Sequence, residues 1–161
     1  MIRTMTADDI SRVLAIYKMG LDTRMATFET VVPSWNDWNS KHLKHSRLVY
    51  SEIGKIFGWS ALSSVSTRLV YKGVAEISIY VDTENLCKGI GSQLMHKLIT
   101  SSEQNGIWTL YSSVFPENIG TLKLHDKFGF RIIGIREKIA QLDGKWKDTI
   151  LLERRSKIIG V

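Results

Sequence analysis

One stretch of the chain, residues 76–99, combines residue types that could bind an anion. Residues 77–81 are rich in β-branched and aromatic residues, as in a buried strand, and a polar turn at residues 82–88 follows. Gly89 and Gly91 then open a segment whose apolar residues recur at helical spacing, at Ile90, Leu94, Leu98 and Ile99. The first N–H groups of a helix lack partners within it and carry partial positive charge, and glycine lets a phosphate approach the backbone. The stretch therefore predicts a phosphate-type anion site.

Two nucleotide-binding motifs do not fit this loop. A dinucleotide fingerprint requires Gly-x-Gly-x-x-Gly or Ala, but Leu94 occupies the last position when the motif begins at Gly89. A Walker loop requires Gly-x-x-x-x-Gly-Lys-Ser or Thr, and no such string occurs in the chain. A helix start whose glycines serve only close packing remains an alternative to the anion site.

Glu76, the first residue of the same stretch, is a second candidate for chemistry. An acid in a strand that is otherwise rich in apolar residues costs free energy unless it is paired or used. We therefore expect Glu76 either to form a cross-strand ion pair with a Lys or Arg or to take part in a reaction.

The composition indicates one ordinary globular domain. The chain has 161 residues, of which 43% are hydrophobic and 24% charged, and its formal net charge is +6. This length favours a single domain over residues 1–161 with a full core. The positive charge favours anionic partners in general. Because Lys and Arg are spread along the chain without a strong block, we expect no nucleic-acid binding.

Cysteine content and hydropathy point to a cytoplasmic protein. The single cysteine, Cys87, excludes an internal disulfide framework and a cysteine-based zinc site, and no metal is expected. No apolar run approaches the length of a membrane span, and residues 1–4 do not open a signal peptide.

The remaining patterns predict the elements that must position these residues, in the order β-α-α-β-β-β-α-β-α-β-β. The expected strands are residues 2–5, 48–53, 55–62, 77–81, 108–114, 130–142 and 146–154; the expected helices are residues 10–17, 34–45, 90–99 and 118–128. A β-α-β crossover through the glycine loop should be right-handed with parallel strands. The predicted fold is α+β, with one twisted, mixed sheet of about seven strands and helices on both faces.

This order, with a glycine loop after the fourth strand, resembles the GNAT superfamily of N-acetyltransferases. In that superfamily, the loop Gln/Arg-x-x-Gly-x-Gly/Ala holds the pyrophosphate of acetyl-CoA. Here the matching string is Leu86-Cys87-Lys88-Gly89-Ile90-Gly91. Both glycines match, whereas Leu86 stands where Gln or Arg is usual, so one side-chain contact of the family is missing.

Four further motifs resemble one branch, the phosphinothricin acetyltransferases, which also includes enzymes for methionine sulfoximine and related amino acids. The motifs are Thr27-Phe28-Glu29, Glu76-x-Ser78-Ile79-Tyr80-Val81, Asn118-x-x-Thr121-x-x-Leu124-His125-x-x-x-Gly129-Phe130, and Gly144-Lys145-Trp146-x-Asp148. They occur in the family's order and span residues 27–148.

The resemblance implies roles for the cofactor side of the site. Backbone groups of Ile79, Tyr80 and Val81 would meet the pantetheine arm. The pyrophosphate would be surrounded by Cys87, Lys88, Gly89, Ile90, Gly91 and Ser92. Asn118 aligns with the family's cofactor-contacting asparagine, although an ordinary helix N-cap explains it equally. Cys87 is not expected to be a nucleophile, because the thioester can be attacked directly.

The same resemblance implies two catalytic residues. Glu76 aligns with the family's catalytic glutamate, which takes the proton of the amine directly or through a water. His125 stands where many superfamily members carry a tyrosine proposed as the acid that protonates the thiolate, and histidine can donate a proton near neutral pH. A purely structural His125 remains the alternative.

For the acceptor substrate, the family string Arg-x-Ala-Tyr is matched here with Val70 in place of Ala. It implies that Arg68 binds a carboxylate or phosphinate and that Leu69, Val70 and Tyr71 line the pocket. Phe28 and Glu29 would form its lid, in a homodimer whose subunits share the site. A second arginine found shortly before this string in relatives is absent, which weakens the case for phosphinothricin itself.

We therefore predict an N-acetyltransferase that uses acetyl-CoA to acetylate the α-amine of a small amino acid or analogue. Acetylation of another amine, such as a polyamine or a peptide N-terminus, is the alternative within the same chemistry. A sensor that binds acyl-CoA without catalysis is the alternative outside it, and the presence of Glu76 argues against that alternative.

Overall fold

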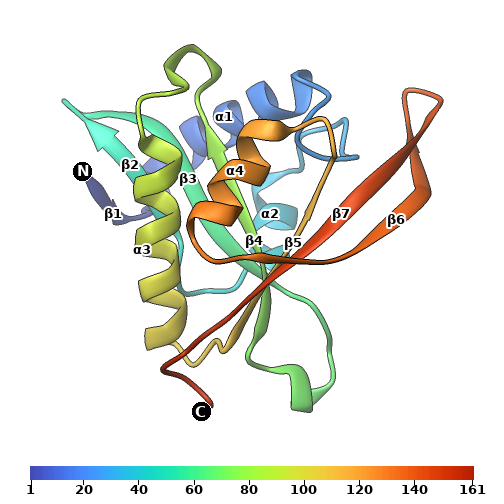
Figure 1. Cartoon of the computed structure of the whole chain (residues 1–161). Coiled ribbons are helices and arrows are strands. Elements are labelled where there is room, and N and C mark those ends of the chain that lie inside the picture. Colours follow the sequence, from blue (N-terminus) through green and yellow to red (C-terminus); the bar gives the residue numbers. More distant parts are fainter.

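The computed structural model describes residues 1–161 and has the predicted order of elements (Figure 1). The strands are β1 (Ile2–Thr4), β2 (Leu48–Glu52), β3 (Lys55–Ser64), β4 (Val74–Val81), β5 (Thr109–Val114), β6 (Arg131–Leu142) and β7 (Lys145–Arg155). The helices are α1 (Ile10–Asp22), α2 (Trp35–Lys41), α3 (Ile90–Gln104) and α4 (Ile119–Lys127). Short 3₁₀ turns lie at Ala7–Asp9, Leu69–Tyr71 and Thr83–Asn85.

The seven strands form one mixed sheet in the order β1-β2-β3-β4-β5-β7-β6. Only β4 and β5 run parallel, and α3 makes the crossover between them, as the sequence predicted. The α+β fold class is thereby confirmed, with helices on both faces of the sheet (Figure 1).

β4 is paired unequally on its two edges. Its pairing with β3 runs from the Ser64–Ala75 pair to the Gly58–Val81 pair, so that edge is closed along the strand. Its pairing with β5 ends at Glu76, which lies opposite Tyr111. Residues 77–81 therefore have a free edge, and their outward backbone groups are available to a ligand.

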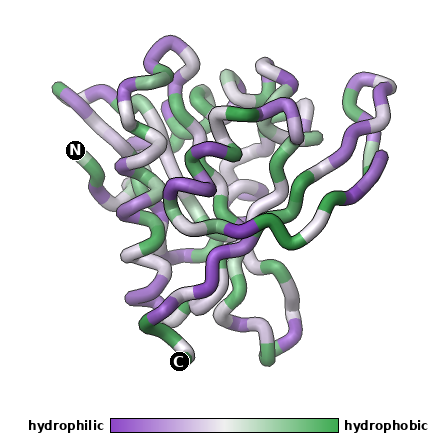
Figure 2. The backbone as a smooth tube through the Cα atoms, in the orientation of Figure 1, coloured by the Kyte–Doolittle hydropathy of each residue, from purple (hydrophilic) through white to green (hydrophobic).

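On one face of the sheet, α3 covers an aliphatic core. The four apolar positions predicted from helical spacing, Ile90, Leu94, Leu98 and Ile99, are all buried. Figure 2 shows the expected alternation of hydrophobic and hydrophilic stretches along α3. The periodicity of the sequence thus fixes which side of this helix meets the sheet.

On the other face, α1 and α2 cover an aromatic core. Trp38 and Trp59 are fully buried and meet edge to face, with ring centroids 5.4 Å apart. Tyr80 stacks on Trp59 at 4.9 Å, and Gly20 of α1 leaves room for the Tyr80 ring, because a Cβ there would lie 2.5 Å from it. Burial of these rings fixes α1 against the sheet.

The second helix ends earlier than the sequence suggested. We expected it to reach about residue 45, but α2 ends at Lys41 because His42 is extended and pairs with Ser63 of β3. Ser63 in turn lies opposite Glu76. This bridge brings the end of α2 beside Glu76. None of the helices combines the length and the apolar content needed to cross a bilayer.

Candidate active site

A cavity of about 1040 Å³ opens where β4 and β5 part. Its walls come from the segment after α1, from β4 and the loop that follows it, from the start of α3, from the end of β5 and from α4. Glu76, His125 and Asn118 all line it, together with most of the predicted cofactor residues. The tertiary structure thus brings together segments nearly one hundred residues apart, from Phe28 to His125.

The N-terminus of α3 forms one end of this cavity. The first hydrogen bond within the helix joins the Gln93 N–H to the Gly89 carbonyl at 3.1 Å, so the N–H groups of residues 90–92 have no helical partner. Gly89 has a left-handed φ of 76°, which favours glycine. Cys87, Gly89, Ile90, Gly91 and Ser92, which the resemblance assigns to the pyrophosphate, line the cavity. Lys88 does not; its ammonium donates instead to Asn85 Oδ1 at 2.7 Å.

Asp82 holds the start of this loop in place. It is buried, pairs with Arg12 of α1, and accepts a hydrogen bond from the Glu84 N–H at 2.9 Å. Arg12 also donates to the Ile56 carbonyl at 3.0 Å. The loop is therefore anchored to α1 and β3 at its first residue, which fixes the direction in which the N-terminus of α3 points.

The free edge of β4 forms the floor of the cavity. Ile79, Tyr80 and Val81, predicted to meet the pantetheine arm through their backbone, all line the cavity and have no partner on the β5 side. The Tyr80 ring itself belongs to the aromatic core, where burial and the neighbouring Tyr17 phenol raise its pKa.

Glu76 lies at the point where the two strands separate. It is half-buried, and its carboxylate forms neither an ion pair nor a hydrogen bond with any other side chain. Burial raises the pKa of Glu76 above that of an ordinary carboxyl group, and the positive charge of Lys41 opposes this rise. The cross-strand ion pair considered as an alternative is therefore not formed. A carboxylate with a raised pKa is a better proton acceptor.

Asn118 caps α4 and also ties down the opposite wall. Its Oδ1 accepts a hydrogen bond from the Thr121 N–H at 3.3 Å, and its Nδ2 donates to the Met25 carbonyl at 3.1 Å. The N-cap alternative is thus realised. Through Met25 the same side chain fixes the segment that carries Phe28, whose ring packs edge to face on Phe115 at 4.9 Å.

His125 is buried against this cavity with one ring nitrogen unused. Its Nδ1 lies 2.7 Å from the Thr121 carbonyl, and since a carbonyl can only accept, Nδ1 carries the proton. Nε2 is buried and has no hydrogen-bond partner. Burial lowers the pKa of His125, so the ring is neutral at neutral pH and Nε2 presents a lone pair.

The residues predicted to bind the acceptor substrate do not all line the cavity of their own chain. Phe28 lines the cavity, whereas Glu29 lies exposed beside it. Arg68, Leu69, Val70 and Tyr71 lie outside the cavity, in the connection between β3 and β4 at the end of β4 away from the glycine loop (Figure 1). The Arg68 guanidinium lies over the Tyr71 ring at 5.4 Å, and Leu69 is 80% exposed.

Several cavity residues escaped the sequence analysis, notably Tyr17, Lys41, Ser78, Lys123 and Lys127. Ser78 could have been found, because it lies two residues after Glu76 and thus on the same face of the strand. Lys123 and Lys127 are four residues apart and share one face of α4. No motif or spacing in the sequence indicates that Lys41 lines the cavity. Its position there depends on the backbone pairing of the next residue, His42, with Ser63.

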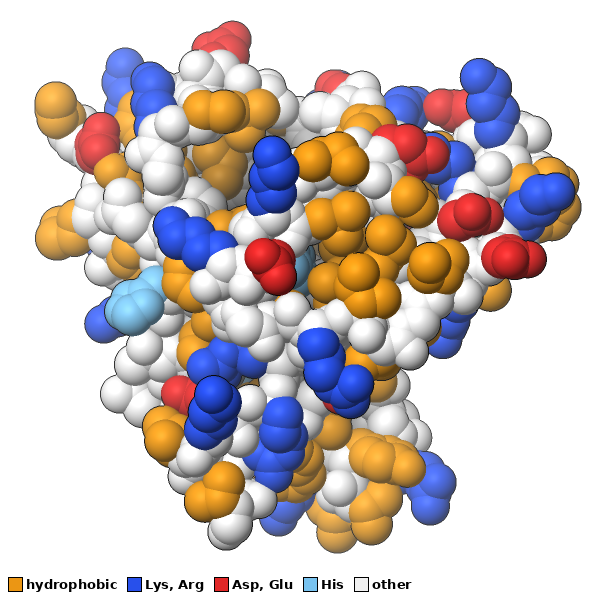
Figure 3. Space-filling view, in the orientation of Figure 1, with side chains coloured by type: hydrophobic (Ala, Val, Ile, Leu, Met, Phe, Trp, Pro, Cys, Tyr) orange, Lys and Arg blue, Asp and Glu red, His pale blue; other side chains and the backbone are white.

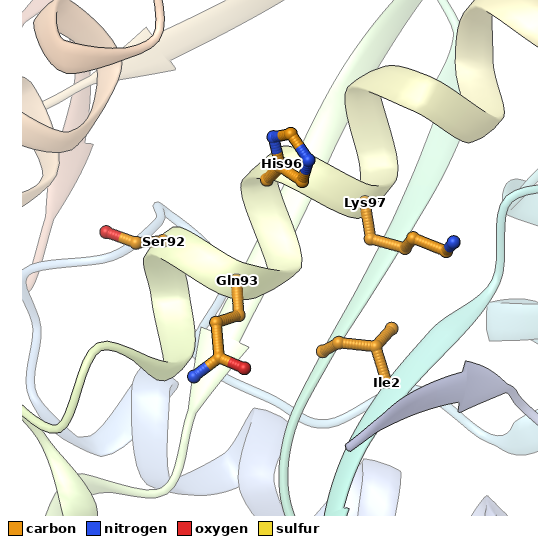
Figure 4. Close-up of a pocket in the computed structure, with 5 residues that line it drawn as sticks. All are labelled: Ile2, Ser92, Gln93, His96 and Lys97. Atoms are coloured by element: carbon orange, nitrogen blue, oxygen red, sulfur yellow. The ribbon is translucent and has the colours of Figure 1, made fainter.

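A second, shallow recess of about 310 Å³ lies beside α3 and β1. Figure 4 shows the residues that line it: Ile2, Ser92, Gln93, His96 and Lys97. Only Ser92 is among the predicted site residues, and its side chain points away from the others in this view. The recess contains no acid, so it offers no counterpart to Glu76.

Comparison with known proteins assigns the class that this fold and site define. Residues 2–151 match the family described as an acetyltransferase (GNAT) domain, and the chain therefore belongs to the GNAT acetyltransferases. The resemblance drawn from the motifs is confirmed.

Within that family, several similar proteins are named for phosphinothricin or methionine sulfoximine. The chain is 35% identical over 152 residues to YwnH of Bacillus subtilis (strain 168), whose name designates a phosphinothricin acetyltransferase; 91% of this chain and 93% of that protein are covered. It is 25% identical over 158 residues to the L-methionine sulfoximine/L-methionine sulfone acetyltransferase of Pseudomonas aeruginosa. The match covers 94% of this chain and 92% of that protein. The crystal structure of a phosphinothricin acetyltransferase from Sinorhizobium meliloti in complex with AcCoA has the same fold, with a TM-score of 0.86 at 22% identity over 99% and 95% of the chains.

Proposed function

We propose that this acetyltransferase moves the acetyl group of acetyl-CoA to the α-amine of a small amino acid or analogue. The observation that carries the proposal is Glu76, an unpaired, half-buried acid in a cavity whose other end is the free N-terminus of α3. One end suits an anionic pyrophosphate and the other suits an ammonium group.

The cofactor would extend from α3 along the free edge of β4. Its pyrophosphate would accept hydrogen bonds from the N–H groups of residues 90–92, supported by the positive end of the helix dipole. The pantetheine amides would pair with residues 79–81, which lack partners on that edge. Asn118, Lys123 and Lys127 of the opposite wall lie along the same path.

In the reaction, Glu76 takes a proton from the substrate ammonium, directly or through a water. The neutral amine nitrogen attacks the thioester carbonyl carbon, a C–N bond forms, and the C–S bond breaks as the carbonyl is restored. The nitrogen loses a second proton and the sulfur gains one, giving an amide and a thiol.

His125 would carry that second proton. Because its ring is neutral, His125 can act as an acid only after Nε2 has accepted a proton. We infer that Nε2 receives the proton from the nitrogen and delivers it to the sulfur. The unpartnered, buried position of Nε2 beside the cavity supports this role.

We also propose that the protein is a homodimer. β6 is one of the two edge strands of the sheet and carries exposed apolar side chains, including Ile132, Ile133 and Ile135. Figure 3 shows hydrophobic side chains gathered where β6 and β7 cross the front of the molecule. A second copy would cover this apolar edge. In a dimer, Phe28 and Glu29 would serve as the lid, and the exposed residues 68–71 would be available to the neighbouring subunit's substrate.

A thiol-release assay with acetyl-CoA and a panel of acceptors tests the proposed function. The panel comprises small α-amino acids, methionine sulfoximine, phosphinothricin, a polyamine and a short peptide. We expect release with the amino acids or their analogues. Release only with the polyamine or the peptide would replace the acceptor class, and binding of acetyl-CoA without release for any amine would favour a sensor.

A further inference from the structure

The end of the cavity that holds Glu76 also holds one cation of the same chain. Lys41 is the last residue of α2, and both Lys41 and Glu76 line the cavity. Two steps of backbone pairing place them together: His42 pairs with Ser63, and Ser63 lies opposite Glu76. The other lysines of the cavity, Lys123 and Lys127, are on α4, along the proposed path of the cofactor.

Neither charge has a partner within the protein. Lys41 and Glu76 are absent from all seven ion pairs and from the hydrogen bonds between side chains, although Lys41 is close enough to influence the charge of Glu76. The two groups lie near one another without touching. Both charges are therefore available to a ligand in the cavity that carries a positive and a negative group.

We propose that Lys41 binds the carboxylate of the amino-acid substrate while Glu76 faces its α-amine. This inference rests on the proposed function and names the residue that recognises the acceptor. In an α-amino acid, one carbon separates the ammonium group from the carboxylate, so a neighbouring acid and cation complement both charges. An ammonium point charge suits a carboxylate without requiring the fixed orientation of a guanidinium.

The remaining charged groups near this end do not supply that cation. Burial is the main reason why the pKa values of the Tyr17 and Tyr80 phenols are raised, and the negative charge of Glu29 adds to both shifts. Glu29 therefore contributes a negative charge near this part of the cavity, as Glu76 does. A polyamine would satisfy the two acids but would be repelled by Lys41. Arg68 lies outside the cavity of its own chain. Lys41 is thus the group through which this chain can prefer a zwitterion over a polycation.

The test compares an amino acid with its amide. Thiol release is measured at saturating acetyl-CoA with L-methionine and L-methioninamide, using the full chain and the variants Lys41→Met, Lys41→Arg and Arg68→Ala. Lys55→Met serves as a matched control, because Lys55 is an exposed lysine of β3 outside the cavity. Thermal unfolding and acetyl-CoA affinity confirm that each variant is folded.

We expect Lys41→Met to lower kcat/KM for methionine about tenfold, mainly through KM, which corresponds to the loss of one hydrogen bond to a charged group. For the amide, kcat/KM should change by less than about twofold, since the amide lacks the carboxylate. Lys41→Arg should retain most of the activity on methionine. An effect of Lys41 on Glu76 itself would change kcat/KM for methionine and for the amide alike, so it cancels in the ratio of the two values.

Four results would overturn the inference or its basis. If Lys41→Met lowers kcat/KM equally for methionine and for its amide, Lys41 has no role in recognising the carboxylate. A selective loss of the acid in Arg68→Ala but not in Lys41→Met would assign the carboxylate to Arg68. If the unmodified protein acetylates a polyamine but neither methionine nor its amide, the proposed function fails, whereas activity on methionine that Lys41→Met leaves unchanged refutes the inference alone.

Discussion

The two ends of β4 differ in their partners. At its beginning, β4 is hydrogen-bonded to β3 on one edge and β5 on the other, and its neighbour Gly73 packs so tightly that a Cβ would lie 2.1 Å from the Trp108 ring. At its end, only the β3 edge is paired. There a Cβ on Gly91, at the start of α3, would meet nothing closer than Leu124 at 3.6 Å.

This difference separates the residues that hold the fold from those that face a ligand. At the beginning of β4, both edges of the strand are paired, so its backbone groups already have partners within the protein. Where the strands part, backbone groups, a carboxylate and an imidazole nitrogen are left unpaired within one cavity. Unpaired polar groups in a partly buried site cost free energy in the absence of a ligand. Changes at the two ends should consequently affect different properties.

The largest effect is expected at the boundary, from Glu76→Gln. Removing a general base typically costs about 10²–10⁴-fold in rate, so kcat should fall by that factor while the acetyl-CoA Kd stays the same. In the unmodified protein, activity should fall with decreasing pH as Glu76 is protonated, at a higher pH than for an ordinary carboxyl group, because burial raises its pKa. The variant should lack this acidic limb. Steady-state kinetics across pH measure both, and an unchanged kcat near pH 7 would reduce Glu76 to a structural acid.

The closed aromatic core should respond to acid through stability. His42 is buried, stacks on Trp38 with centroids 4.0 Å apart, and burial lowers its pKa from 6.5 to about 4. The folded state therefore disfavours the protonated ring. The contribution of neutral His42 to the free energy of unfolding is fully present above about pH 6.5 and is lost as the pH falls toward 4. The total loss should be about 3 kcal/mol, at about 1.4 kcal/mol per pH unit.

Urea unfolding at several pH values measures this loss. His42→Phe keeps a ring against Trp38 and removes the titration, so the free energy of unfolding should depend less on pH in the variant. Parallel pH profiles for the two proteins would contradict the assignment to His42.

At the open end, Gly91→Val should weaken cofactor binding with little loss of stability. A Cβ added at this position meets only ordinary van der Waals contacts in the protein, and the side chain would occupy the approach to the helix N-terminus. Losing one charge-assisted hydrogen bond there corresponds to about a ten- to hundredfold rise in the acetyl-CoA Kd. Gly91 is a cleaner test than Gly89, whose φ of 76° would strain any other residue. Calorimetric titration measures the Kd, and wild-type affinity would show that the pyrophosphate lies elsewhere.

At the closed end, Gly73→Ala should have the opposite pattern. Its Cβ would overlap the Trp108 ring, which must shift, and overpacking typically costs about 1–3 kcal/mol. Acetyl-CoA affinity of the folded variant should be unchanged, because Gly73 does not line the cavity. Chemical denaturation and titration on the same sample separate the two effects. Equal stability of Gly73→Ala and the unmodified protein would remove the contrast between the two ends.

Much of the fold was predictable because its determinants are local. The order of strands and helices and the buried side of α3 follow from hydrophobic periodicity and from the residues that begin and end each element within short windows. The end of α2 was placed about four residues too late, because it depends on the pairing of His42 with Ser63, which no local pattern records.

The candidate site divides in the same way. Most of the residues that the sequence named in the glycine loop and at the edge of β4 line the cavity, since they are contiguous and belong to a motif. Lys41 was missed because it enters the cavity from a different helix. Arg68 was expected in the substrate pocket from its motif, and the connection that carries it lies outside the cavity of its own chain.

The sequence by itself determined the elements, their order and the glycine loop that begins α3, because these rest on interactions between residues close in the chain. Only the tertiary structure decided where β4 and β5 separate, that Glu76 and Lys41 face one cavity without pairing, and that His125 keeps Nε2 free. Each of these features depends on contacts between distant segments. Their positions are set by how the whole sheet and its helices pack, and no short stretch of sequence contains that information.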